Sequence, residues 1–119
     1  DMMPNDLSGG MKKRVSLARA IALDPKTILY DEPTAGLDPL RSMDINRLIV
    51  GMQRHLKATS ILVTHDMRSA FYAADRIAFL QGGRFRLIAP KEEFKHTEDR
   101  EVLQFIYGGE LPEERETML

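Results

Sequence analysis

Two carboxylates and a histidine occupy positions from which they could handle a phosphate group. Asp31 and Glu32 directly follow the apolar run Thr27–Tyr30, and His65 comes just after a second apolar run, Thr59–Val63. A carboxylate at the end of a buried strand can hold Mg²⁺, which takes only one or two protein carboxylates when phosphates are bound. A neighbouring carboxylate can polarise an attacking water, and an imidazole can donate to a phosphate oxygen. Taken singly, each residue also fits a polar turn or an exposed surface.

A serine and two glycines offer a second possible phosphate contact. Ser8, Gly9 and Gly10 precede a segment with helical periodicity. Glycines let backbone N–H groups approach an anion closely, and the helix N-terminus adds its positive dipole end. By itself this is also an ordinary helix cap, and Asp38 before Pro39 is by itself an ordinary turn residue.

Alternating periodicities predict the elements that would position these residues. Helices are predicted at Met11–Leu23, Leu40–Leu56, Met67–Ala74 and Asp99–Tyr107, with a helical turn starting at Pro90, and strands at Thr27–Tyr30, Thr59–Val63, Arg76–Leu80 and Arg84–Ile88. Such alternation implies an α/β fold with parallel strands joined by helical crossovers. The continuous apolar run Thr59–Val63 predicts a sheet buried on both faces. Ligands bind beyond the carboxyl ends of such strands, so Asp31, Glu32 and His65 are expected at one edge.

Four further expectations concern the late part of the chain and the other histidines. Gln81–Gly83 predicts a hairpin turn, Val102, Leu103 and Ile106 predict one packed face of the last helix, and the polar tail from Gly108 is expected to fray. The remaining histidines, His55 and His96, lie among polar residues and are expected to be solvated.

Composition narrows the function classes. The chain has 119 residues, a formal net charge of -1, 43% apolar residues and no cysteine. The charge gives no reason to expect nucleic acid as the main partner. The absence of cysteine excludes disulfides and thiolate metal sites. No apolar run approaches the ~18 residues that a membrane span needs.

The order and spacing of the motifs are more specific than any single one. The segments Leu7–Arg14, Ile28–Pro33, Ala35–Pro39 and Thr64–Asp66 together resemble the carboxyl-terminal half of an ABC transporter ATPase, over roughly residues 5–90. The resemblance implies a P-loop NTPase (RecA-like) parallel sheet flanked by helices. No Gly-x-x-x-x-Gly-Lys-Ser/Thr loop occurs in the chain, which begins at Asp1 without an initiator Met. A fragment lacking the phosphate-loop half, and inactive alone, is therefore expected.

The resemblance also implies a division into segments. Residues 1–23 would end the helical subdomain with the signature motif and its helix. Residues 24–95 would form the last part of the ATPase core, and residues 96–119 the final helix and tail.

Roles for individual residues follow from the same resemblance. Ser8, Gly9 and Gly10 would form the signature loop, which contacts ATP held by the opposite subunit of a head-to-tail dimer. Asp31 would orient Mg²⁺, Glu32 would be the general base, and His65 would contact the γ-phosphate. Asp38 would cross the dimer interface. Met11 stands where the family often has Gln, a change expected to tune function.

The same resemblance implies the partners and the transported substrate. ATP would be the substrate, Mg²⁺ the cofactor, and a second ATPase subunit and a membrane permease the partners, at the cytoplasmic face of the inner membrane. Met11–Arg14 and Arg100–Ile106 resemble the Mla-like group, which moves phospholipids or hydrophobic compounds. Two alternatives remain open: a non-transporter ABC-type ATPase of DNA repair or translation, and a non-catalytic dimerising remnant.

Overall fold

The computed structural model describes residue 3, residues 8–109 and residue 111. Residues 1–73 and residues 74–119 form two compact units, which are described separately. The predicted loop entry before Ser8 lies outside the described residues, as does most of the tail that was expected to fray.

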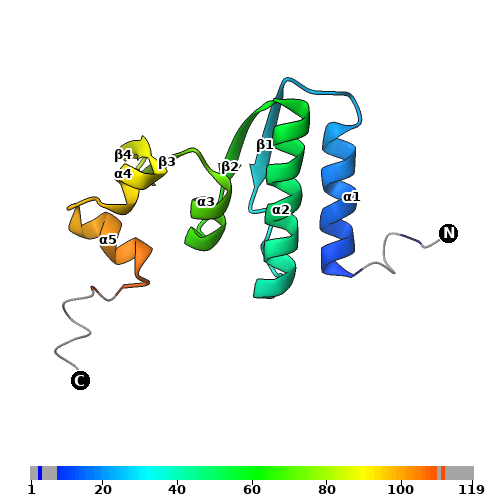
Figure 1. Cartoon of the computed structure of the whole chain (residues 1–119). Coiled ribbons are helices and arrows are strands. Elements are labelled where there is room, and N and C mark those ends of the chain that lie inside the picture. The colour runs from blue at the N-terminus through cyan, green and yellow to red at the C-terminus, as the bar shows by residue number, and fades with distance from the viewer. Residues whose placement is uncertain (1–2, 4–7, 110, 112–119) are drawn as a thin grey trace. The chain divides into compact units, whose positions relative to one another are not determined.

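The first unit alternates helices and strands as predicted. Its elements are α1 (Gly9–Ile21), β1 (Thr27–Asp31), α2 (Pro39–Leu56), β2 (Thr59–Val63) and α3 (Met67–Ala73). Helix α1 begins two residues earlier than the predicted Met11, because Ser8 is its N-cap and accepts the N–H of Met11 at 3.2 Å. Figure 1 shows α1 and α2 side by side.

Helix α2 has clear boundary signals at both ends. Asp38 caps its start, Pro39 occupies the first turn, where a missing N–H costs nothing, and Lys57 ends it in the left-handed conformation with φ 53°. The helix crosses over between two strands that pair in parallel, from Thr27 opposite Thr59 to Asp31 opposite Val63. This register confirms the predicted parallel pairing, and it puts the residues that follow each strand at the same edge.

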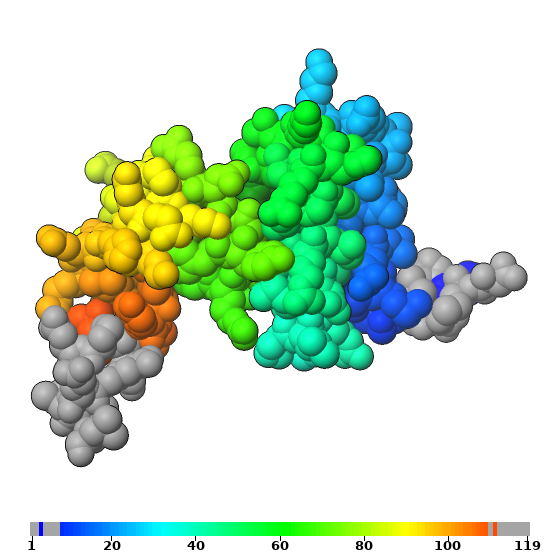
Figure 2. All heavy atoms as spheres, viewed as in Figure 1, coloured from blue at the N-terminus to red at the C-terminus, as the bar shows by residue number. Residues whose placement is uncertain are grey.

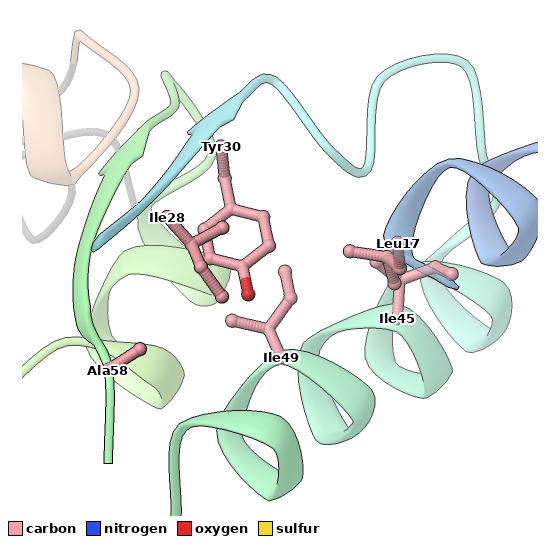
Figure 3. Packing of buried hydrophobic residues seen from close by; sticks show 6 residues of the cluster. All are labelled: Leu17, Ile28, Tyr30, Ile45, Ile49 and Ala58. Atoms are coloured by element: carbon pink, nitrogen blue, oxygen red, sulfur yellow. The ribbon is translucent and has the colours of Figure 1, made fainter. Parts of the chain in front are cut away.

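The core of this unit lies between β1 and the two long helices. Figure 3 shows Ile28 and Tyr30 of β1 directed toward Ile49 of α2, and Leu17 of α1 beside Ile45. The predicted α2 face is confirmed, because Ile45 and Ile49 are buried and Leu48 and Met52 pack against the same cluster. The surfaces of α1 and α2 adjoin in the space-filling view (Figure 2).

The prediction that the β2 sheet is buried on both faces is wrong for the described residues. Ile61 and Val63 of β2 are 54% and 56% exposed, and Leu29 of β1 is 73% exposed. Successive strand residues face opposite sides of a sheet. Ile28 and Tyr30 therefore face the helices, whereas Leu29 of β1 and Ile61 and Val63 of β2 face away from this core.

The second unit is an antiparallel hairpin with two short helices. It contains β3 (Arg76–Gln81), β4 (Arg84–Pro90), α4 (Lys91–Lys95) and α5 (Arg100–Ile106). Gly82 and Gly83 have φ 57° and 75°, as a tight hairpin turn requires, so the predicted turn is confirmed.

Aromatic and ionic contacts hold this second unit together. Val102 and Phe94 are fully buried, and Phe79 and Phe105 meet edge to face with ring centroids 5.2 Å apart. Arg86 pairs with Asp99, the N-cap of α5, at 2.8 Å. The predicted face of the last helix is confirmed by the burial of Val102. None of the described helices combines the length and apolar character needed to cross a lipid bilayer.

Candidate active site at the edge of the parallel sheet

Glu32 occupies a constrained backbone position immediately after β1. Its φ is 45°, a left-handed value that costs a non-glycine residue about 1–2 kcal/mol. Three contacts hold it there: its N–H donates to the Val63 carbonyl at 2.8 Å, and its own carbonyl accepts from the Ala35 N–H at 3.1 Å and the Lys13 ammonium at 3.4 Å. Backbone strain maintained by its surroundings is characteristic of functional positions.

The Glu32 carboxylate meets the segment that follows β2. Its Oε1 accepts the His65 backbone N–H at 3.0 Å and lies 2.7 Å from His65 Nδ1. Its Oε2 accepts the Thr64 hydroxyl at 3.3 Å. The prediction that parallel pairing brings Glu32 and His65 to one edge is thereby confirmed, although 33 positions separate them.

This contact shifts the acidity of both side chains. The hydrogen bond from His65, assisted by its charge, lowers the pKa of Glu32 against the opposing effect of desolvation. The hydrogen bond to Glu32, its negative charge and the more distant charge of Asp66 raise the pKa of His65. The His65 side chain is 77% exposed, so its outer ring nitrogen stays available to a ligand. Glu32 is thus held ionised beside an imidazole that readily carries a proton.

The His65 pKa yields a pH prediction. Its imidazole should titrate above the ordinary value of about 6.5, and Glu32→Gln should lower that midpoint because the charge of its partner is removed. The contribution of His65 to folding should be fully present below its unfolded-state pKa and be lost as pH rises through the raised one, whereas the contribution of Glu32 should be lost as pH falls through its lowered pKa. Imidazole resonances followed by NMR against pH test this. A midpoint that Glu32→Gln leaves unmoved would show that the pair does not form in solution.

Asp31 is the last residue of β1 and is exposed. No ion pair engages it within the part of the chain that the structure describes. Across those residues, no group of three or more His, Asp or Glu side chains could hold a metal unaided. A single free carboxylate fits Mg²⁺ that is bound mainly through phosphates and water. Asp31 therefore suits a metal that arrives with a nucleotide.

Ser8, Gly9 and Gly10 form the first turn of α1. The Ser8 hydroxyl caps that turn, and a Cβ on Gly9 would lie 3.3 Å from Leu37 Cδ2, a tight contact with the end of a flexible side chain. A hollow of about 160 Å³ beside this turn is lined in part by Ser8, Gly10, Arg14 and Arg41. No hydrogen bond or ion pair among the described residues joins this turn to Glu32 or His65. The signature role of these residues remains a prediction.

Asp38 is fully engaged within its own chain. It caps α2 through the Arg41 N–H at 2.9 Å and pairs with the Arg41 guanidinium at 3.0 Å. The backbone hydrogen bond from Arg41, helped by its charge, lowers the pKa of Asp38. Its predicted place at a dimer interface is not tested by these contacts.

Three residues at this site belonged to the motifs in the sequence but were given no individual role there. Lys13 reaches the Glu32 carbonyl from α1, and the Thr64 and Asp66 side chains organise the turn around His65. Thr64 and Asp66 directly flank His65, and that adjacency was the available signal. For Lys13 no signal in the sequence indicated the contact with Glu32, because that contact depends on how α1 packs. The expectation for His55 and His96 is confirmed, since both are exposed.

Comparison with known proteins decides the fold family. The family model described as "ABC transporter" matches residues 1–35. The solved structure of cbiO1 from Clostridium perfringens, part of the ABC transporter complex cbiONQ, superimposes with a TM-score of 0.75 and 35% identity, covering 99% of this chain and 46% of that one. The chain has the fold of part of an ABC transporter ATP-binding domain. The predicted α/β P-loop NTPase class is confirmed.

The curated relatives of this chain are named for different transported substrates. The phosphate import ATP-binding protein PstB of Aeropyrum pernix is 41% identical over 91% of this chain and 43% of its own length. The intermembrane phospholipid transport ATP-binding protein MlaF of Haemophilus influenzae is 39% identical over 90% of this chain and 40% of its own length. The chain thus spans less than half of each relative. The similarity supports the ABC ATP-binding domain and does not single out the Mla-like group.

Proposed function

We propose that this chain carries the hydrolytic part of an ATP-binding subunit that powers a membrane transporter, with Glu32 as general base. The observation that carries the proposal is the pairing of Glu32 with His65 at 2.7 Å, at the carboxyl edge of the parallel strands of an ABC-type fold. Ligands of open α/β sheets bind at that edge.

Each residue would contribute a separate physical effect. Glu32 would orient a water and accept its proton, since its carboxylate is kept ionised. His65 would donate to the γ-phosphate through the ring nitrogen that does not face Glu32. Mg²⁺ held at Asp31 would neutralise charge on the phosphates. Because phosphoryl transfer needs positioning more than covalent chemistry, these three effects are of the kind that hydrolysis requires.

The partners we propose are a second copy of the ATPase subunit and a membrane permease, with the subunit peripheral at the cytoplasmic membrane face. The similar protein cbiO1 is part of the ABC transporter complex cbiONQ, which supports a permease partner. The exposure of Ser8 and Gly9 at the start of α1 supports a signature loop that serves a neighbouring subunit. A site that needs both subunits would couple ATP binding to dimer formation.

A mixing experiment tests this arrangement. Activity assays should use the product of the complete gene, because these residues hold no Gly-x-x-x-x-Gly-Lys-Ser/Thr loop. Ser8→Arg and Glu32→Gln should each lower hydrolysis about 100-fold or more. Equal mixing of the two variants should restore about a quarter of the activity, because half of the dimers then hold one intact site of two.

The outcome separates action in trans from action in cis. Mixtures that stay inactive, while each variant still binds ATP and dimerises, would show that Ser8 and Glu32 serve the same subunit's site. Ser8→Arg should leave ATP binding to the monomer nearly unchanged. Loss of that binding would also argue against a role in trans.

For the cargo, we propose a phospholipid or similar hydrophobic compound. Support comes from the similarity to MlaF and from the Met11–Arg14 and Arg100–Ile106 segments. The similarity to PstB, at 41% identity, makes phosphate the competing cargo. With the permease reconstituted in vesicles, ATP-dependent movement of labelled phospholipid but not of labelled phosphate is expected, and the reverse result would overturn this assignment.

A further inference from the structure

Two buried polar side chains of the first unit have no role in the chemistry described so far. Asn46 of α2 and Ser69 of α3 are 2% and 1% exposed, and Asn46 Nδ2 donates to Ser69 Oγ at 2.8 Å. Asn46 Oδ1 is buried and has no hydrogen-bond partner among the described residues. An unsatisfied buried acceptor costs about 1–3 kcal/mol. The Asn46 side chain therefore lowers the stability of the fold compared with an apolar residue, and a role other than stability is the better explanation for it.

The donor and the acceptor in each hydrogen bond of Ser69 can be assigned. Its single hydroxyl proton goes to Asp66 Oδ2 at 2.8 Å, so its oxygen must accept from Asn46. The second oxygen of Asp66 accepts the Arg68 N–H at 3.0 Å. Both oxygens of the Asp66 carboxylate are thus engaged, which holds that side chain at the start of α3.

The same chain of hydrogen bonds continues to Glu32. The backbone N–H of Asp66 donates to Thr64 Oγ1 at 3.0 Å, and the Thr64 hydroxyl donates to Glu32 Oε2 at 3.3 Å. His65 lies between these two anchored residues and bonds the other carboxylate oxygen. The His65 side chain is 77% exposed, so packing contributes little to its orientation and these bonds must supply it.

We propose that Asn46 and Ser69 are positioning residues, which hold the Thr64–Asp66 turn so that His65 and Glu32 stay aligned. The inference rests on the proposed ATPase function and extends it to two side chains that do not touch the reacting atoms. It links the candidate base to helix α2, which Asp38 caps. Fixing catalytic groups through hydrogen-bonded supporting residues is a general route to preorganisation.

Asn46→Leu separates positioning from stability. This substitution removes the amide donor and the unsatisfied acceptor together and replaces them with an apolar side chain of similar size. Thermal unfolding should therefore occur at the same temperature or higher, whereas kcat for ATP hydrolysis should fall about tenfold with KM changed less than about twofold. Ser69→Ala should lower kcat similarly, and Ser69→Thr should restore most of it by returning the hydroxyl.

Ser60→Ala is the matched control. It removes a serine hydroxyl that donates to Gln53 Oε1 at 2.6 Å, in the same unit but outside this chain of bonds. Its kcat should stay near wild type. If Ser60→Ala lowers kcat as much as Ser69→Ala does, or if Asn46→Leu leaves kcat unchanged, the positioning role is overturned.

A second readout does not depend on hydrolysis. The His65 backbone N–H donates to Glu32, so its hydrogen exchange, followed by NMR, should be faster in Asn46→Leu and Ser69→Ala but not in Ser60→Ala. Retained hydrolysis in Glu32→Gln would contradict the proposed function. Faster exchange in Asn46→Leu and Ser69→Ala would still support alignment by Asn46 and Ser69. Unchanged exchange in both variants would reject that alignment whatever the activity.

Discussion

Replacing Glu32 with Gln should nearly abolish ATP hydrolysis. The amide keeps the shape of the side chain but cannot accept a proton, so the loss should reach about 100- to 10,000-fold in kcat, the usual contribution of a general base. ATP binding and ATP-dependent dimerisation should persist, because no proposed nucleotide contact is removed. Steady-state phosphate release and nucleotide binding, measured on the complete gene product, test both halves of this expectation.

The matched control is Glu98→Gln. Glu98 is exposed, and no ion pair or hydrogen bond of its side chain is recorded among the residues that the structure describes. The same chemical change there should leave kcat within about twofold, as for a surface group away from the reacting atoms. Unaltered steady-state hydrolysis in Glu32→Gln would exclude Glu32 as the base, and the Glu32–His65 pair would then be a structural contact.

Ile45→Ala should destabilise the first unit by about 2–5 kcal/mol. Ile45 is 1% exposed and lies beside Leu17 of α1 in the cluster that also contains Ile49 (Figure 3). Truncation removes buried methyl and methylene groups where two helices pack, and neighbouring elements can close only part of the cavity. The midpoint of urea-induced unfolding, followed by circular dichroism, measures the effect.

Leu40→Ala gives the comparison within the same helix. Leu40 is 74% exposed at the start of α2, so a similar truncation should change the free energy of unfolding by no more than about 0.5 kcal/mol. Equal effects of the two substitutions would mean that Ile45 is not part of a packed core. Such a result would contradict the arrangement of α1 and α2 that positions Lys13 near Glu32.

Local structure could be predicted from the sequence because its causes are short-range. Ser8 caps α1 by accepting an N–H three residues ahead, and Gly82 and Gly83 supply the positive φ values of a hairpin turn. The Asp38 cap of α2 is equally local, although Asp38 by itself was predicted only as a turn residue. The meeting of Glu32 and His65 was also predictable. This contact needs only two parallel strands whose carboxyl ends lie at the same edge of the sheet, and the two apolar runs indicated such strands.

The exposure of the β2 side chains could not be predicted from the residues of that strand alone. A continuous apolar run indicates strand burial but does not say which neighbours cover each face, and Ile61 and Val63 are half exposed in the described residues. Burial depends on elements distant in sequence, and no local pattern specifies where those elements lie.

The helices and strands, the parallel pairing of β1 with β2 and the residues that could do chemistry were all predictable from the amino-acid sequence. How those residues are held became visible in the folded chain: the left-handed backbone of Glu32, the Lys13 contact from α1, and the link from Asn46 through Ser69. Caps and turns depend on residues a few positions apart, and the Glu32–His65 contact follows from strand pairing, which the apolar runs indicated. The contacts of Lys13 and Asn46 instead depend on how helices pack, and no local pattern specifies that packing.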